Sequence, residues 1–136
     1  MMQKSIKFAQ SLKPQALFIK NQFAFAKVIN LEKQEDFENL VTSNPKPVIV
    51  DFTATWCGPC KQLSPKLDKL AEAGSDNWDI VKVDIDKFQY LATIFNVSAV
   101  PTVYLMHKGE LVLDMVGLDA KKLDEMAVKA ELLGNK

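Results

Sequence analysis

Short apolar runs alternate with amphipathic stretches along the chain from about residue 26 onward. The run 48–52 is β-branched and apolar apart from Asp51, which predicts a strand covered on both faces. Residues 80–85 form a second run of this kind. Apolar residues at helical spacing predict helices over about 34–42, 60–73, 88–95 and 120–133.

The order of these elements predicts an α/β fold. Strands and helices alternate from a short strand at 26–29 through the strand at 80–85, which favours a sheet with parallel neighbours. Two further strands, 102–106 and 111–116, are separated by four residues that include Gly109, so they should form an antiparallel hairpin. Asp119 stands where it can cap the last helix.

The first 26 residues differ in composition from the remainder. Residues 1–31 contain five lysines and no acid before Glu32, which leaves 12 lysines against 17 acids in the rest, so the folded part, 27–136, is acidic. A basic, acid-poor segment that contains serine is typical of an organelle transit peptide, although this one lacks Arg and is divided by Pro14. We interpret residues 1–26 as a mitochondrial presequence. The alternatives are a disordered or docking extension and a cytoplasmic location.

Composition excludes several classes of function. No stretch approaches the roughly 20 apolar residues that span a bilayer, so no membrane span is expected. An acidic body without Arg lacks the basic patch that binds nucleic acid, and we set that class aside. A zinc site would need two ligands besides the two cysteines, and only His107 is available, so no metal is expected.

Cys57 and Cys60 indicate redox chemistry. They would close a very short loop, and a structural disulfide of that size constrains the unfolded chain little. Cys57 lies between a predicted strand and a helix, where free backbone N–H groups and the helix dipole favour the thiolate that attacks disulfides. Pro59 suits the first turn of that helix, because its missing N–H would have no partner there. Cys60 can then attack a mixed disulfide at Cys57 and release the reduced substrate.

From about residue 26 to its end, the sequence resembles the thioredoxin family. The motif Trp56-Cys57-Gly58-Pro59-Cys60-Lys61 carries the resemblance and is highly specific. Further matches at the expected spacing are Asp51, Phe52, Pro65, Lys82, Asp84, Val100-Pro101-Thr102, Gly109 and Val116-Gly117. The resemblance implies a thioredoxin fold, with a central mixed five-stranded sheet flanked by four helices. It also implies a thiol-disulfide oxidoreductase that has no bound cofactor and receives electrons from NADPH through a thioredoxin reductase.

The same resemblance implies roles for residues outside the motif. Pro101 would follow a cis peptide bond, with the backbone of Val100 turned toward the cysteines to pair with an extended substrate. Asp51 would lie behind Cys60 and near Lys82, with a pKa raised by burial, and would accept the proton of the resolving thiol. The docking surface around Cys57 would consist of Trp56, Gly58, Pro59, Val100, Pro101 and Gly117. Thr53 departs from the family, in which many members carry an aromatic residue or His, so the rim beside the motif should be smaller.

The function expected from the sequence is the reduction of protein disulfides, with thioredoxin reductase and disulfide-containing proteins as partners. One alternative is a thioredoxin-fold subunit of a larger assembly, docked through residues 1–26, with a structural or redox-regulatory role. The native mass would distinguish a free protein from such a subunit. Oxidases and isomerases of the protein-disulfide-isomerase type usually carry His in place of Pro59, so the sequence favours a reducing pair.

Overall fold

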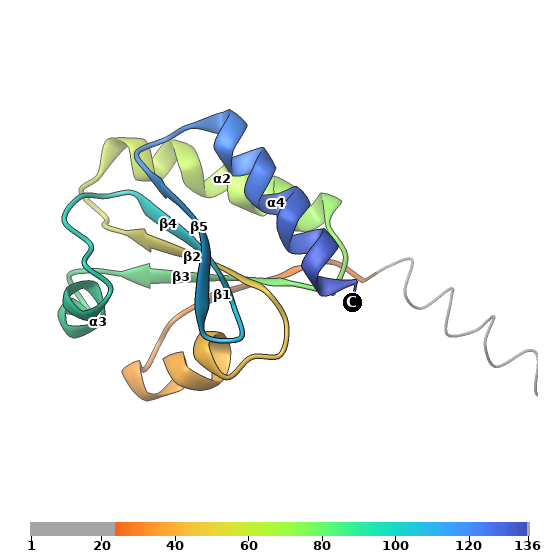
Figure 1. Ribbon diagram of the computed structural model, residues 1–136. Coiled ribbons are helices and arrows are strands. Elements are labelled where there is room, and N and C mark those ends of the chain that lie inside the picture. The colour runs from red at the N-terminus through yellow and green to blue at the C-terminus, as the bar shows by residue number, and fades with distance from the viewer. Residues whose placement is uncertain (1–23, 136) are drawn as a thin grey trace, which may run out of the picture.

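The computed structural model describes residues 24–135, which form a mixed five-stranded sheet with helices on both faces (Figure 1). The strands are β1 (Lys27–Asn30), β2 (Val48–Thr53), β3 (Asp79–Asp84), β4 (Thr102–His107) and β5 (Glu110–Val116), in the order β1-β3-β2-β4-β5. β3 pairs parallel with β1 and β2, and β4 pairs antiparallel with β2 and β5. The expected α/β fold is confirmed. Residues 1–23, most of the segment interpreted as a presequence, lie outside the described residues.

Two helical layers enclose the sheet. α2 (Gly58–Ala73) and α4 (Ala120–Gly134) cover one face, and α3 (Gln89–Ile94) covers the other together with η1 (Gln34–Asp36) and η2 (Glu38–Thr42) (Figure 1). The helix predicted at 34–42 is present but is not α-helical, because a 3₁₀ turn leads into a wider π-type turn. This path still buries Phe37 and Val41, so packing against the sheet outweighs local helical preference here.

The two-residue period of β2 assigns its side chains to two separate cores. Val50 and Phe52 lie in the core on the side of α3, η1 and η2, whereas Ile49 lies in the core under α2 and α4. Asp51 alternates with Val50 and Phe52 and therefore faces α2, as Ile49 does. The prediction that this strand is covered on both faces is confirmed. The carboxylate of Asp51 is thus enclosed between the sheet and the helical layer that contains α2.

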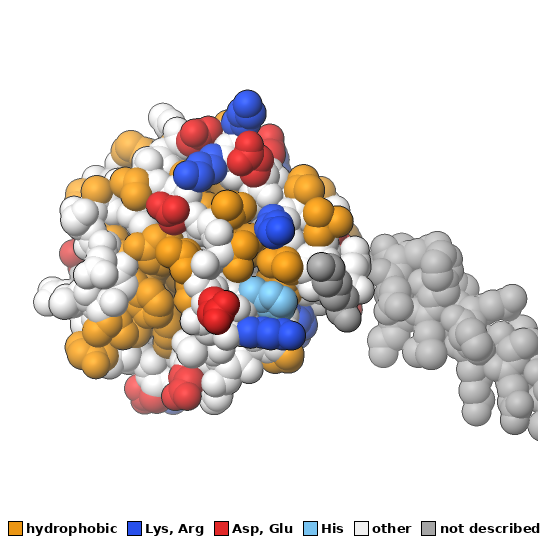
Figure 2. Space-filling view, in the orientation of Figure 1, with side chains coloured by type: hydrophobic (Ala, Val, Ile, Leu, Met, Phe, Trp, Pro, Cys, Tyr) orange, Lys and Arg blue, Asp and Glu red, His pale blue; other side chains and the backbone are white. Residues whose placement is uncertain are grey.

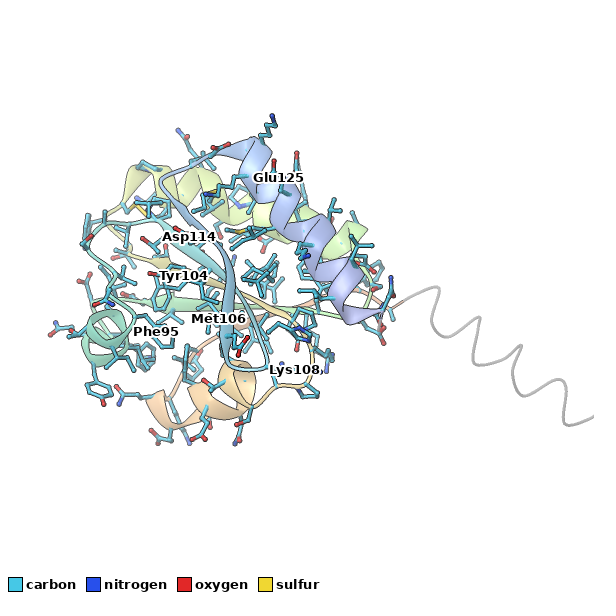
Figure 3. All side chains as sticks on the ribbon, in the orientation of Figure 1. Phe95, Tyr104, Met106, Lys108, Asp114 and Glu125 are labelled. Carbon is cyan, nitrogen blue, oxygen red and sulfur yellow. A yellow bond between two sulfur atoms is a disulfide. The ribbon has the colours of Figure 1, made fainter. Side chains whose placement is uncertain are left out.

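Aromatic side chains fill the core on the side of α3. The ring centroids of Phe37 and Phe95 lie 5.3 Å apart, and those of Phe52 and Tyr104 lie 5.6 Å apart. The hydroxyl of Tyr104 donates a hydrogen bond of 2.8 Å to the backbone carbonyl of Phe95. The side chains of these two residues, labelled in Figure 3, lie with their ring centroids 6.4 Å apart. The hydrogen bond fastens the end of α3 to β4.

The turn between β4 and β5 consists of Lys108 and Gly109. Both residues have positive φ, 53° and 79°, which is the conformation of a type I′ turn and matches the twist of the strands. Glycine adopts this conformation at little cost, whereas Lys108 is strained there. The hairpin predicted around Gly109 is confirmed.

Hydrophobic side chains remain exposed on the outer side of α4, beside acidic and basic ones (Figure 2). Val128 and Leu132 of α4 and Leu113 of β5 line a hollow of about 460 Å³ there. The amphipathic pattern of α4 therefore buries one side of the helix and leaves a second, smaller apolar strip facing outward.

In the described part of the chain, no helix combines the length and the apolar character needed to cross a membrane.

The loop after α2 is fastened to α4 through Trp78 and Glu131. The indole Nε1 of buried Trp78 donates to the Glu131 carboxylate at 2.6 Å, and the hydroxyl and backbone N–H of Ser75 donate to the same carboxylate. A Cβ on Gly74 would lie 2.6 Å from a ring carbon of Trp78, so glycine lets the helix end pass the indole. Burial raises the pKa of Glu131, but hydrogen bonds from Ser75, Trp78 and Asn77 outweigh burial and leave that pKa below its usual value.

Glu131→Leu should destabilise the protein by about 1–3 kcal/mol, because the buried indole N–H of Trp78 would lose its acceptor. Glu131→Gln should cost less, since its amide oxygen can still accept that bond. The pKa of Glu131 is lower in the folded than in the unfolded protein. The carboxylate therefore stabilises the fold above the unfolded-state pKa, and this contribution is lost as pH falls through the folded-state value.

Denaturant unfolding of the wild type and both variants, at neutral and at acid pH, measures these effects. The advantage of Glu131 over Gln should shrink in acid. A difference that does not change with pH would contradict the role of the ionised carboxylate.

Candidate redox site

Cys57 and Cys60 lie where β2 leads into α2 and are joined by a disulfide, with their Cα atoms 5.3 Å apart. Cys57 has an extended backbone and caps α2, and its Sγ accepts a hydrogen bond of 3.2 Å from the N–H of Cys60. Pro59 lies in the first turn of the helix, as expected. The sulfur of Cys57 therefore lies at the N-terminus of a 16-residue helix, where the dipole and the free N–H groups favour a thiolate.

The segment before β4 forms the second side of the site. The peptide bond between Val100 and Pro101 is cis, as the resemblance implies, and Val100 packs against the buried cluster of Ala54, Cys57 and Cys60. The N–H of Gly117 donates to the carbonyl of Pro101 at 2.8 Å, which brings the end of β5 beside the cis proline. The structure thus brings Val100, Pro101 and Gly117 together next to the cysteines.

Trp56 is the most exposed aromatic residue of the predicted docking surface, with 66% of its surface accessible. Its indole Nε1 donates to a carboxylate oxygen of Asp86 at 2.8 Å, and the N–H of Asp86 donates to Asp84 at 2.9 Å. Asp86 therefore orients an exposed ring beside the disulfide. Sequence analysis did not find Asp86, because the two residues are 30 positions apart and no local pattern connects them. Gly58, also in the predicted surface, is exposed.

Asp51 is enclosed between β2 and α2, with 2% of its surface accessible. One of its oxygens, Oδ1, has no hydrogen-bond partner among the described residues. Burial raises the pKa of Asp51 to about 7, and the positive charge of Lys82 offsets only part of this effect. A carboxyl that titrates near neutral pH can both accept and return a proton there.

Lys82 faces Asp51 but directs its hydrogen bonds elsewhere. The two residues are register partners on β3 and β2, yet the ammonium of Lys82 donates to Ser64 Oγ at 2.7 Å and to Asp68 Oδ1 at 3.1 Å. The predicted relation between Asp51 and Lys82 is thus electrostatic, without a hydrogen bond between these two side chains. Sequence analysis did not single out Ser64 and Asp68. The available signal was their four-residue spacing from Cys60, which puts all three on one face of α2.

A shallow hollow of about 330 Å³ opens on the side of Cys60. It is lined by Thr53, Ala54, Thr55, Cys60, Lys61, Ser64 and Asp84. Thr53, the residue that departs from the family pattern, forms part of this wall, where a larger side chain would occupy space. Across residues 24–135, no group of three or more His, Cys, Asp or Glu side chains could hold a metal ion.

Comparisons with known proteins agree with this geometry. A family model named Thioredoxin matches residues 27–129. A mitochondrial thioredoxin of Bos taurus is 44% identical over 89 residues, which cover 65% of this chain and 54% of the relative. The chain therefore spans about half the length of such curated relatives.

Two solved structures extend the likeness to the fold. The crystal structure of Schistosoma mansoni thioredoxin matches with a TM-score of 0.71 and 40% identity, over 78% of this chain and 97% of that one. A yeast structure, described as the basis of the thiol resolving mechanism in a mitochondrial 1-Cys peroxiredoxin via glutathione/thioredoxin systems, matches with a TM-score of 0.68 and 31% identity, over 75% and 94%. The family match includes the whole sheet, both cysteines and the cis proline, and the chain belongs to the thioredoxin family.

Proposed function

We propose that this protein is a protein-disulfide reductase that acts by dithiol–disulfide exchange through Cys57 and Cys60. The observation that carries the proposal is the unequal environment of the two sulfurs. Cys57 caps α2, where a thiolate is stabilised, whereas Cys60 is buried in the first turn of that helix, which covers the face of the sheet that carries Asp51. One sulfur is thus suited to attack and the other to resolve.

The exchange proceeds in two displacements. The thiolate of Cys57 attacks one sulfur of a substrate disulfide, whose S–S bond breaks, and the other substrate sulfur leaves as a thiolate. Asp51 then takes the proton from Cys60, and the new thiolate attacks Cys57 and displaces the second substrate sulfur. Two electrons pass from the protein to the substrate, which leaves as a dithiol, while Cys57 and Cys60 become the disulfide.

Electrons for the next cycle would come from NADPH through a thioredoxin reductase, which opens the Cys57–Cys60 disulfide by the same exchange chemistry in reverse. No bound cofactor is required. Substrates would be proteins with accessible disulfides, which the exposed ring of Trp56 and the half-buried side chain of Val100 can contact, whereas Pro101 itself is buried. The likeness to the yeast structure concerned with a peroxiredoxin supports a peroxiredoxin as one candidate substrate.

A mitochondrial location is the second part of this proposal. It is supported by the basic, acid-free composition of residues 1–26 and by the likeness to mitochondrial thioredoxins. Fused to a fluorescent protein, residues 1–26 should direct it to mitochondria, and a fusion with Lys4, Lys7, Lys13 and Lys20 changed to Gln should stay in the cytoplasm. Cytoplasmic fluorescence from the unchanged fusion would contradict the presequence.

Substitution of either cysteine tests the two-sulfur cycle. Cys57→Ser should abolish the reduction of a protein disulfide by NADPH and a thioredoxin reductase, because no thiolate remains to attack. Cys60→Ser should stop turnover after the first displacement and accumulate a mixed disulfide at Cys57, which mass spectrometry detects. The intact pair should have a reduction potential nearer to the value of thioredoxin itself, about −270 mV, than to the isomerase value of about −180 mV. Full turnover by Cys60→Ser would contradict the assigned roles.

Asp51→Asn tests the buried carboxyl. The pKa of Asp51 is raised in the folded protein, so folding favours its protonated form and stability falls as pH rises from the unfolded-state value to about 7. Asp51→Asn should therefore raise the free energy of unfolding at slightly alkaline pH, by on the order of 4 kcal/mol, and should change it little in acid. It should also slow the release of substrate from the mixed disulfide.

Chemical denaturation of the oxidised protein at both pH values measures the stability, and stopped-flow kinetics of a mixed disulfide formed at Cys57 measures the release. A variant that is destabilised at alkaline pH, or that resolves as fast as the wild type, would contradict the role of Asp51.

A further inference from the structure

We propose that Ser64 and Asp68 are positioning residues for the resolving step, because they hold the ammonium of Lys82 away from Asp51 and so preserve the strength of that carboxylate as a base toward Cys60. This inference rests on the dithiol exchange proposed above. It concerns the second displacement, in which Cys60 must lose its proton.

The register of the sheet brings Lys82 and Asp51 together. They are paired residues of β3 and β2, and Lys82 lies between Val81 and Val83, both of which face the opposite core. Lys82 therefore points to the same side of the sheet as Asp51. Its flexible four-carbon stem leaves two destinations for the ammonium, the carboxyl of Asp51 or the polar residues of α2.

The Lys82 ammonium lies beside the polar residues of α2. It donates to Ser64 Oγ at 2.7 Å and to Asp68 Oδ1 at 3.1 Å, while Asp51 Oδ1 has no partner among the described residues. The side chain of Lys82 is 13% accessible and that of Asp68 is 52% accessible, so the pair lies at the boundary between core and solvent. The proposed role of Ser64 and Asp68 explains why Asp51 Oδ1 remains unpaired although Lys82 is its neighbour in the sheet.

The other elements around Asp51 supply little competing charge. β4 contributes Val103 as the register partner of Asp51, and α4 contributes apolar residues to this core, together with the Glu131 carboxylate, which accepts a hydrogen bond from Trp78. On β3, Asp84 follows Lys82 at two residues and so shares its side of the sheet. The side chains of α2 and α4 that face this core or the Lys82 ammonium include two acids, Asp68 and Glu131, besides Cys60, Leu63, Ser64, Leu67, Leu70, Ala71, Leu123, Met126, Ala130 and Leu133. Among the described residues, Lys82 is thus the cation whose charge acts on Asp51.

The position of this charge determines how strong a base Asp51 is. A cation in direct contact with a carboxyl lowers its pKa by about 1–3 units, and a general base works best with a pKa near the working pH. If Lys82 turned to pair with Asp51, the carboxylate would be a weaker base toward the Cys60 thiol. Burial raises the pKa of Asp51 to about 7, and Lys82 lowers it only in part. Ser64 and Asp68 each accept a hydrogen bond from the ammonium, which keeps its positive charge from lowering that pKa further.

We call the contacts of Ser64 and Asp68 with the Lys82 ammonium the clamp. Removal of the clamp should lower the ionisation midpoint of Asp51. In the oxidised protein, where both cysteines are in the disulfide and do not titrate, carbon-13 NMR of the Asp51 carboxyl measures that midpoint directly. Asp68→Asn and the double variant Ser64→Ala/Asp68→Asn should shift it to lower pH, by about one unit in the double variant. Asp68→Glu should restore the wild-type midpoint, because its carboxylate can still reach Lys82.

Two matched controls separate the clamp from a general effect of charge. Glu72→Gln removes an exposed carboxylate from the same helix, one turn beyond Asp68, and should leave the Asp51 midpoint unchanged. Lys82→Met should raise the midpoint, and in that background the substitutions at Ser64 and Asp68 should have little further effect. A clamp that acts through Lys82 requires this loss of coupling.

The kinetic counterpart is the pH profile of the resolving step. With a mixed disulfide preformed at Cys57, the double variant should release its substrate along a profile displaced to lower pH, with a lower rate at the plateau. An unchanged Asp51 midpoint in the double variant would overturn the proposal, and so would equal shifts with and without Lys82. Failure of the protein to reduce disulfides would refute the proposed function, whereas the NMR titration would still decide whether the clamp exists.

Discussion

The central strand β2 is hydrogen-bonded along both edges and covered on both faces, so each of its side chains belongs to one of two cores. This constraint fixes the site. The position of Asp51 in the alternation directs a carboxylate toward α2. The strand ends at Thr53, and Cys57 follows four residues later at the N-terminus of that helix. A slip of one residue in register would move Asp51 into the aromatic core beside Phe95 and away from α2.

In the proposed exchange, two cysteines three positions apart acquire different chemistry from different parts of the fold. Cys57 depends on backbone groups, because the N-terminus of α2 stabilises its thiolate whatever side chains surround it. Cys60 depends on side chains, and these come from β2, β3 and α2 together: the buried carboxyl of Asp51, the ammonium of Lys82 and the residues that hold that ammonium. The first environment is local in the sequence, whereas the second exists only once the sheet has formed.

The same distinction explains what could be predicted from the sequence. The strands at 48–52 and 80–85 were predicted correctly, because short apolar runs rich in β-branched residues favour strands over helices. The spacing of Cys57, Pro59 and Cys60 indicated the start of a helix and redox chemistry. The segment 34–42 was predicted as a helix, but its 3₁₀ and π-type turns follow from the packing of Phe37 and Val41 against the sheet. The bonds from Trp56 to Asp86 and from Lys82 to Asp68 join distant segments, and a single sequence has no pattern that connects them.

α2 is held unevenly along its length. The loop beyond its C-terminus is fastened to α4 through Trp78 and Glu131, and its middle is tied to β3 through Lys82. At its first turn, by contrast, a Cβ on Gly58 would meet no heavy atom within 4 Å. The far end of α2 is therefore held by side-chain hydrogen bonds, whereas position 58 borders open space. A side chain at position 58 would project outward beside the disulfide, where it would meet a docking protein and not the cores of this one.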